Sequence, residues 1–163
     1  MVLKENIGMK KVIEHGFSYM TTPDLVSSRV LEGTGFAPRS SEQSDEYFIE
    51  GEDLALIATA EMAITGYHMD EIIDEAKLPL LYAGYSACFR KEAGAYGKYT
   101  RGLFRVHQFN KLEMYIFCLP EQSKEMHEKI LGIEEEIWQE LGIPYHVINI
   151  AAGDLGAPAA KKY

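Results

Sequence analysis

Apolar residues recur with a helical period in the last third of the chain. After Pro120 they fall at successive steps of four, three, four and four residues, at Met126, Ile130, Ile133, Ile137 and Leu141. That spacing places them on one stripe of a helix, and the acidic residues of this segment lie largely off the stripe. We therefore predict a helix over residues 120–141, closed by Gly142. A shorter helix is predicted over residues 3–15.

Two long extended segments, residues 80–92 and 102–118, occupy the middle of the chain. In the second segment the even positions from residue 112 onward are all apolar, so they predict a side that faces the core. A glycine-containing loop at residues 93–101 joins the two segments. Together they predict a long antiparallel hairpin with an oversized tip.

Shorter elements surround this hairpin. Thr22, Pro23 and Asp24 supply a capping hydroxyl, a proline at the first position and an acid, which predict the start of a helix. We expect that helix to end near Gly33. The remaining segments predict two helical pieces within 60–76, a polar loop at 38–46 and short strands at 17–21, 47–50, 54–59 and 145–150. This mixture predicts an α+β domain in which helices flank a mostly antiparallel sheet, with residues 1–163 as a single unit.

Composition narrows the class of protein. The 163 residues are 47% hydrophobic and 25% charged, as is usual for soluble globular proteins, and no apolar run is long enough to cross a membrane. The first residues lack the charged and apolar regions of a signal peptide, so we predict a cytoplasmic protein with no membrane partner. Cys88 and Cys118 stand apart from any Cys or His cluster, so we predict no metal site.

The formal net charge of -9 argues against nucleic-acid binding when it is taken alone. The distribution of the charge points the other way. Six of the 16 basic residues lie within residues 89–111, together with only one of the 25 acidic residues, Glu92. A positive strip of this kind on an acidic body attracts phosphate groups at one place and repels them elsewhere.

The hairpin can gather polar side chains on one face, because side chains alternate along a strand. In the second strand, Arg105, Phe109 and Glu113 share one side if no bulge intervenes. In the first strand, Arg90 and Glu92 share a side as well. Pairing of the two strands then predicts one polar floor that carries all five residues, and a one-residue slip would exchange the faces.

The residue types on this floor suit a nucleotide beside an amino acid. The guanidinium forks of Arg90 and Arg105 fit phosphate or carboxylate oxygens and can stabilise charge at a reacting phosphorus. Phe109 offers a flat face for stacking a base, and Glu113 can hold an ammonium group. The pattern alone also fits a solvated strand face with surface ion pairs, which contribute about 0–1 kcal/mol each.

A longer run of sequence adds specificity to this pattern. Residues 89–114 contain Phe-Arg-Lys-Glu, then Thr-Arg-Gly-Leu, Arg-Val-His-Gln-Phe and Lys-Leu-Glu-Met. In this order they resemble motif 2 of the seryl-tRNA synthetases, a class II aminoacyl-tRNA synthetase family, with the motif spanning about residues 80–118. The Ala-Thr-Ala-Glu of residues 58–61 resembles the serine-binding loop of that family, and the region of about residues 3–25 resembles its motif 1.

The resemblance implies roles in ATP binding for the residues at matching positions. Arg90 would be the catalytic residue, gripping the α-phosphate of ATP and the carboxylate of serine. Glu92 would help to read the adenine end, and Arg105 would contact the triphosphate. Phe109 would stack on adenine, and Val106 is also implied to contact ATP.

The resemblance implies further contacts for serine and for tRNA. Thr59, Glu61 and Glu113 would bind serine together with the arginine of the first strand. Lys98 and Arg101, at the hairpin tip, would approach the acceptor end of tRNA(Ser).

The implied reaction is ATP-dependent activation of serine to seryl-adenylate and pyrophosphate, followed by transfer of serine to tRNA(Ser). No covalent enzyme intermediate is needed, so positioning and charge stabilisation would carry the catalysis. His107 is expected to be structural rather than a general base. The family also implies a homodimer and Mg²⁺, with the metal ligands outside this chain.

The resemblance covers a truncated part of a class II synthetase catalytic domain. Motif 3 and the N-terminal tRNA-binding arm have no counterpart in the sequence, so we expect little or no activity from the chain alone. Two other interpretations stay open. One is an amino acid ligase that acts on a carrier protein, and the other is a non-catalytic interaction module derived from a synthetase.

Overall fold

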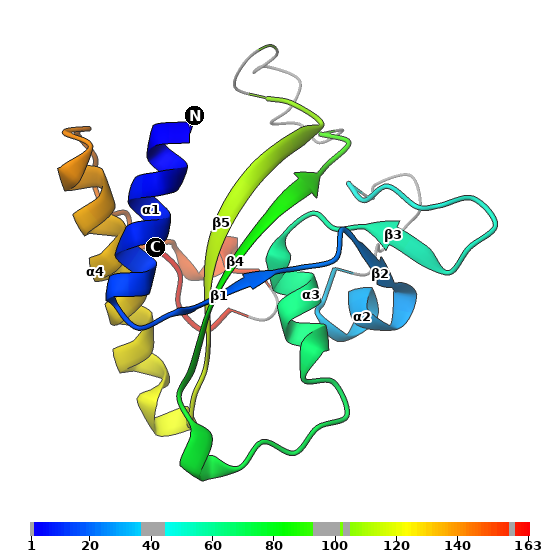
Figure 1. Cartoon of the computed structure of the whole chain (residues 1–163), viewed down its shortest axis with the longest axis horizontal. Helices are drawn as coiled ribbons and strands as arrows, with labels where there is room; N and C mark the ends of the chain where they lie inside the picture. Colours follow the sequence, from blue (N-terminus) through cyan, green and yellow to red (C-terminus); the bar gives the residue numbers. More distant parts are fainter. Residues whose placement is uncertain (1, 37–44, 93–101, 103–104, 157–158) are drawn as a thin grey trace.

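The computed structural model describes residues 2–36, 45–92, 102, 105–156 and 159–163. A three-stranded sheet runs diagonally through its centre (Figure 1). Helices α1 (Val2–Glu14) and α4 (Ser123–Glu140) lie together on one side of this sheet, and α3 (Ala60–Tyr67) lies on the other (Figure 1). The predicted α+β arrangement of helices flanking a sheet is therefore confirmed.

Strands β1 (Ser18–Thr21), β4 (Leu80–Phe89) and β5 (Gln108–Phe117) form the central sheet in the order β1-β4-β5. β4 and β5 pair antiparallel along their whole lengths. The predicted hairpin is therefore confirmed, whereas its tip at residues 93–101 lies outside the described residues. β1 runs parallel to β4, so the sheet is mixed and its longest pairing is antiparallel.

A hydrophobic core joins the two long helices to the sheet. Val12 of α1, Ala83 of β4 and Ile133 of α4 are almost completely buried in it. Other side chains packed against this core come from β5 and α4: Leu112, Met114, Ile116, Ile130 and Ile137. The even-numbered face of β5 and the apolar stripe of the helix after Pro120 thus face the core, as the sequence predicted.

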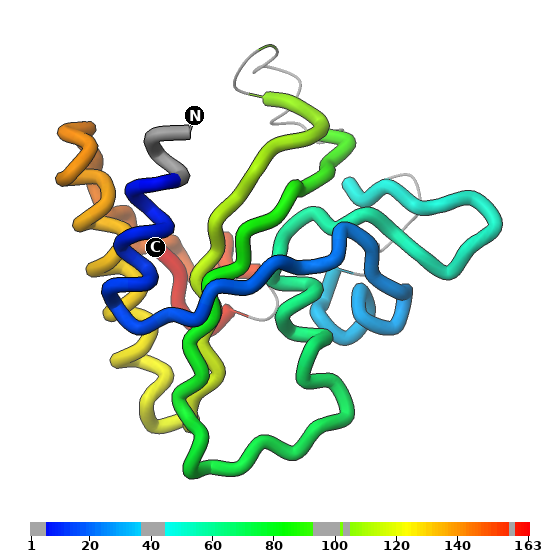
Figure 2. Tube along the Cα trace, in the orientation of Figure 1, coloured from blue at the N-terminus to red at the C-terminus, as the bar shows by residue number. Residues whose placement is uncertain are grey.

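A smaller unit covers the opposite face of the sheet. Helix α2 (Ser28–Gly33) and the antiparallel pair β2 (Leu25–Ser27) and β3 (Leu54–Leu56) share a second core with α3. Helix α3 also contacts β4 and β5. It lies between the sheet and the smaller unit (Figure 2). The start of α3 is therefore held between the second core and the sheet.

The close approach of α3 to β4 depends on Gly84. A Cβ atom at this position would lie 2.6 Å from Cδ1 of Ile64 and 2.9 Å from Cβ of Ala60, both of which belong to α3. Gly84 is also the Cα partner of Glu113 in the hairpin. The glycine therefore lets the first turn of α3 lie against the face of β5 that carries the odd-numbered residues.

The predicted helix start at residues 22–24 is wrong. Those residues lead into strand β2, and α2 begins only at Ser28. Val26 of β2 is buried against β3, and the Asp24 carbonyl accepts a hydrogen bond from the Ile57 amide at 2.9 Å. Pairing with a distant strand therefore prevails over the local capping pattern. The predicted end of the helix is confirmed.

Other short elements also differ from the prediction. The strand expected at residues 47–50 is reduced to one bridge, between Phe48 and Ala55. Residues 145–150 form no strand, and their Ile150 amide instead bonds the Lys162 carbonyl at 3.0 Å. Short 3₁₀ turns are η2 (Glu75–Lys77), which replaces the second helical piece, η3 (Pro120–Gln122), which opens α4, and η4 (Ala152–Asp154).

Candidate functional site

The hairpin face that points away from α1 and α4 carries the predicted polar floor. Arg90 extends the β4–β5 ladder, because its backbone amide donates to the His107 carbonyl at 3.0 Å. Its guanidinium carbon lies 5.3 Å from the centroid of the Phe109 ring, in a cation–π contact. Its Nε also donates to the Ala58 carbonyl at 3.3 Å. The side chain is thus held between an aromatic ring and the segment that precedes α3.

Arg90 and Glu113 lie on the same side of the sheet. Arg90 reaches the start of α3 through Ala58, and Glu113 reaches it through the hydroxyl of Thr59. This shared face is the geometric condition on which the predicted floor depends, because a one-residue slip would have separated the two side chains.

An ion pair lies at the end of the hairpin next to its connecting loop. Arg105 Nη1 donates to Glu92 Oε2 at 3.0 Å, and the two side chains are 35% and 15% exposed. Glu92 has a φ of 53°, in the left-handed region, where the chain leaves the strand. Val106 beside them is 39% exposed. Two of the residues predicted to contact ATP therefore neutralise each other in this structure.

Thr59 is both the N-cap of α3 and the centre of a hydrogen-bonded cluster. Its side chain is buried, and its hydroxyl donates to the Glu113 carboxylate. The Glu61 amide donates to Thr59 Oγ1 at 3.3 Å and to Glu113 Oε2 at 3.1 Å. The first turn of a helix has free backbone amides and the positive end of the helix dipole. In this structure the first turn of α3 binds the Glu113 carboxylate of β5.

Lys111 completes this cluster, although the sequence did not single it out as a site residue. Its Nζ lies 2.6 Å from Thr59 Oγ1 and 3.1 Å from Glu113 Oε1. A signal for it was present in the sequence, because residues two apart in a strand share one face. The contact with Thr59 could not be predicted from the strand pattern, because Thr59 lies in a different part of the chain.

The cluster contains a second acidic side chain, Glu61. Burial raises the pKa of its carboxyl above the ordinary value of 4.5, and the negative charge of Glu113 raises it further. The positive charge of Lys111 acts in the opposite direction. Two carboxylates therefore face one ammonium group at the start of α3.

His107 contacts the segment before β3 rather than the polar floor. Its Nδ1 is in hydrogen-bonding contact with the Tyr47 hydroxyl. Next to it, the Lys91 amide donates to the Asp45 carbonyl at 2.8 Å. These contacts attach the loop end of the hairpin to residues 45–47. They fit the structural role expected for His107, which stays a prediction.

The floor has two chemically different ends. Near Arg90 and Phe109, a guanidinium group and an aromatic ring suit phosphates and a base. Near Thr59 and Glu113, a carboxylate, a hydroxyl and backbone amides suit a ligand with an ammonium and a hydroxyl group. The two ends adjoin, because Ala58 contacts the first and is followed directly by Thr59.

Lys98 and Arg101, expected to approach tRNA, lie outside the described residues. Across the residues that the structure does describe, no three or more His, Cys, Asp or Glu side chains form a group that could hold a metal ion. No helix in this part combines the length and the apolar character that a membrane crossing requires.

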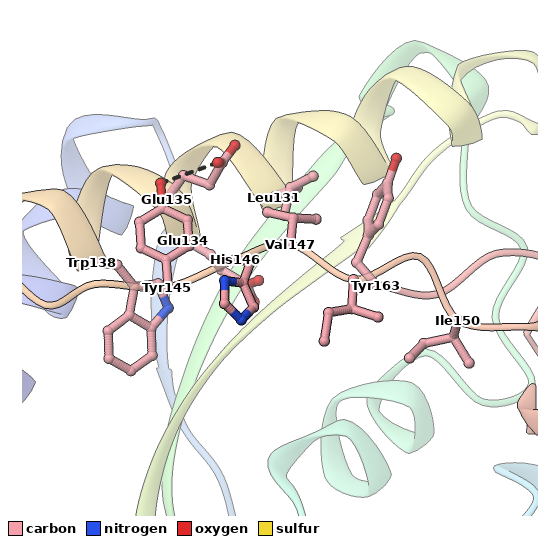
Figure 3. A pocket seen from close by; sticks show the side chains of 10 residues that line it. Leu131, Glu134, Glu135, Trp138, Tyr145, His146, Val147, Ile150 and Tyr163 are labelled. Carbon is pink, nitrogen blue, oxygen red and sulfur yellow. Dashed lines mark hydrogen bonds between the residues drawn. The ribbon is translucent and has the colours of Figure 1, made fainter.

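A separate hollow of about 420 Å³ lies between α4 and the C-terminal segment (Figure 3). Leu131, Trp138 and Ile150 contribute apolar side chains to it. The Tyr145 hydroxyl donates to Glu135 Oε1 at 3.1 Å beside it (Figure 3). Its lining includes none of the predicted site residues, so it is distinct from the polar floor.

This fold, with a polar floor on an antiparallel hairpin, is that of the class II aminoacyl-tRNA synthetase catalytic domains. The structure matches seryl-tRNA synthetase from Pyrococcus horikoshii complexed with ATP with a TM-score of 0.89 and 49% identity, covering 96% of this chain and 34% of that one. It matches the cytoplasmic serine–tRNA ligase from Naegleria fowleri in complex with AMP with a TM-score of 0.85 and 39% identity, covering 96% and 37%.

Sequence comparison leads to the same class. The serine–tRNA ligase of Dictyoglomus turgidum is 57% identical over 152 residues, which are 93% of this chain and 36% of that protein. Residues 45–163 match the family model of the tRNA synthetase class II core domain (G, H, P, S and T). The chain belongs to this family. It spans little more than a third of the length of the curated relatives, 36% in the Dictyoglomus protein.

Proposed function

We propose that the chain carries the serine- and ATP-binding part of a serine–tRNA ligase. The observation that supports this most strongly is the shared face of Arg90 and Glu113, each in contact with the start of α3. The names of the relatives point the same way, since they are serine–tRNA ligases and two solved structures contain ATP or AMP. Because the chain spans 36% of such a relative, we expect little or no activity from it alone.

In this proposal serine binds where α3 meets β5. Glu113 accepts hydrogen bonds from the ammonium and hydroxyl groups of serine, and Thr59 and Glu61 line the same place. A carboxylate in such a half-buried position needs a cationic partner, which the amino acid supplies. The carboxylate of serine then points toward Arg90.

ATP binds along the other end of the floor. Adenine stacks on Phe109 beside Val106, and Arg90 contacts the α-phosphate. Arg105 exchanges its ion pair with Glu92, now 3.0 Å long, for the triphosphate, which frees Glu92 for the adenine end.

Activation follows from this placement. The serine carboxylate attacks the α-phosphorus, the bond to the β-phosphate breaks, and seryl-adenylate and pyrophosphate form. Arg90 stabilises the negative charge that develops at the α-phosphate. Holding the two substrates side by side supplies the rest of the rate enhancement, and no covalent bond to the protein is needed.

The transfer step brings tRNA(Ser) to the hairpin tip, where Lys98 and Arg101 offer positive charge to phosphates. Mg²⁺ is expected to accompany ATP in the family, and the part of the chain that the structure describes contains no group of three or more His, Cys, Asp or Glu side chains that could hold it. In this proposal the protein acts in the cytoplasm.

The proposal includes a homodimer formed through α1 and β1. Ile13 and Tyr19 are 53% and 49% exposed on these elements. With Asn6, Met9 and Tyr85 they line a hollow of about 310 Å³. Apolar groups gathered on a surface mark interaction sites, and this region coincides with the motif 1-like sequence.

Exchange of pyrophosphate into ATP tests the activation step. A protein of the relatives' length that contains this sequence is expected to catalyse exchange with serine and not without it. Exchange that is independent of serine, or that prefers another amino acid, would contradict the proposal. Charging of a carrier protein instead of tRNA(Ser) would favour the carrier-protein ligase.

Calorimetry with this chain tests the binding half of the proposal and separates it from a non-catalytic module. We expect binding of ATP and of L-serine, with ATP binding weakened in Arg90→Ala. If neither ligand binds to the chain or to the longer protein, the interaction module is favoured.

A further inference from the structure

Lys111 lies at the centre of the serine end of the floor, yet the proposed function gives it no role. Its Nζ bridges Thr59 Oγ1 at 2.6 Å and Glu113 Oε1 at 3.1 Å. These are two of the side chains that the proposed function assigns to the amino acid. An ammonium group of the protein therefore occupies the partners that the ammonium group of the substrate requires.

We propose, resting on the proposed function, that Lys111 is a positioning residue. Its ammonium group occupies the subsite between Thr59 and Glu113 until the ammonium group of the amino acid displaces it. In the absence of substrate, Lys111 keeps Glu113 aimed at the start of α3. When the amino acid arrives, its ammonium group replaces that of Lys111.

The charges around the subsite explain why a cation is needed there at all times. Glu113 lies 3.1 Å from Lys111 Nζ, and Glu61 is near enough for both charges to act on its carboxyl. The pKa of Glu61 is raised by burial and by Glu113, and the charge of Lys111 counters part of that rise. Lys111 thus favours the ionised form of Glu61 before the substrate supplies a cation of its own.

The side chain of Lys111 is suited to leaving. It is 29% exposed, so its amine can move outward into water while the residue stays in β5. Lysine carries a compact, strongly hydrated charge on a flexible four-carbon stem, whereas arginine is a rigid planar fork. One ammonium replaces another, so the charge of the subsite is conserved and no proton has to be gained or lost.

This exchange makes the subsite selective for ligands that carry an ammonium group. A neutral or anionic analogue of serine has no cation to offer Glu113, so it leaves Lys111 in place. The site therefore selects ligands by the charge of their amino group before it selects them by their hydroxyl group.

NMR titration of the chain tests the electrostatic half of the inference without any ligand. Lys111→Met is expected to raise the pKa of Glu61 further, because it removes the positive charge that lowers this pKa in the wild type. Lys111→Arg retains the charge and is expected to keep the pKa near its wild-type value. Lys77→Met removes an exposed lysine of η2 as a matched control. An unchanged Glu61 pKa in Lys111→Met overturns the inference.

Ligand titration tests the displacement itself, read from the Nζ signal of Lys111. L-serine and L-serinamide, which both carry an ammonium and a hydroxyl group, are expected to move that signal to the position of a hydrated lysine. 3-Hydroxypropanoate, which lacks the ammonium group, is expected to leave it unchanged.

The backbone amide signals of Thr59 and Glu61 separate the inference from the proposed function. If L-serine moves these amide signals while Lys111 Nζ stays on Glu113, the inference is overturned and the proposed function stands. If saturating L-serine moves neither, the proposed function itself is overturned, together with the inference that rests on it.

Discussion

Gly84 and Glu113 are Cα partners in the β4–β5 ladder, and the first turn of α3 lies directly against the glycine. That turn begins with Thr59, whose hydroxyl donates to the Glu113 carboxylate. Because Gly84 of β4 has no side chain, α3 can approach closely enough for Thr59 to contact the Glu113 carboxylate of β5.

Gly84→Ala is expected to lower the free energy of unfolding by about 1–3 kcal/mol, as overpacking of a core typically does. The added Cβ atom would meet Ile64 Cδ1 at 2.6 Å and Ala60 Cβ at 2.9 Å, so α3 would have to move. Urea denaturation measures the loss. Gly132→Ala, in α4 where an added Cβ meets nothing within 4 Å, should instead stabilise by about 0.5–1 kcal/mol. Equal effects of the two substitutions would show that α3 does not press on β4.

Arg90→Ala is expected to weaken ATP binding by about 10- to 100-fold, because a hydrogen bond to a charged group contributes about 1.5–3 kcal/mol. The substitution removes the guanidinium group that lies over Phe109. Calorimetry with ATP measures the change. The matched control is Arg29→Ala, since Arg29 is exposed and bonds Asp70 at 2.9 Å. If both variants bind ATP as the wild type does, the assignment of Arg90 to the phosphate is wrong.

The carboxyl group of Glu61 is expected to make the folded chain relatively more stable in acid. Its pKa is raised above the ordinary value of 4.5, first by burial and then by the charge of Glu113, so the folded state holds the proton more tightly than the unfolded state. This stabilisation is fully present below the unfolded pKa of 4.5 and is lost as the pH rises through the raised folded pKa. Glu61→Gln removes the dependence, so it should gain stability relative to the wild type as the pH rises.

Urea midpoints of the wild type and Glu61→Gln across a pH series measure this difference. Glu52→Gln changes an exposed carboxyl away from the cluster and serves as the control. A difference between Glu61→Gln and the wild type that stays constant as the pH rises above 4.5 would contradict the assignment.

Ile13→Asp is expected to convert the proposed homodimer to a monomer, because it places a charge on the apolar surface formed by α1 and β1. Light scattering after size-exclusion chromatography measures the mass. Ile72→Asp is a matched control, since Ile72 is 97% exposed in the segment between α3 and η2. A wild-type chain that stays monomeric at high concentration would remove the claim.

The hairpin and its two faces could be predicted from the sequence because alternation along a strand is a local property. The apolar even positions of β5 indicated the core side, and Phe109 and Glu113 followed on the other side. The long amphipathic helix α4 was predictable for the same reason, since its stripe repeats several times.

The features that the sequence did not predict depend on distant neighbours. Residues 22–24 satisfy the local rules for a helix start, but β3 arrives later in the chain and pairs with the segment that follows them. Residues 145–150 have the composition of a strand, yet strand structure requires a hydrogen-bonding partner, and they lie along α4 instead (Figure 3). Lys111 was missed because its partner Thr59 is brought to it only by the packing of α3.

The hydrogen bond from Arg90 Nε to the Ala58 carbonyl joins the two ends of the floor through one peptide group. A nucleotide that drew Arg90 toward its phosphates would release that carbonyl, one residue before the threonine that contacts Glu113. An amino acid that ordered the same loop would, in turn, alter the support of the arginine. If the two ends bind the proposed substrates, occupancy of either end is therefore expected to change the affinity of the other, and thermodynamic linkage makes that influence equal in both directions.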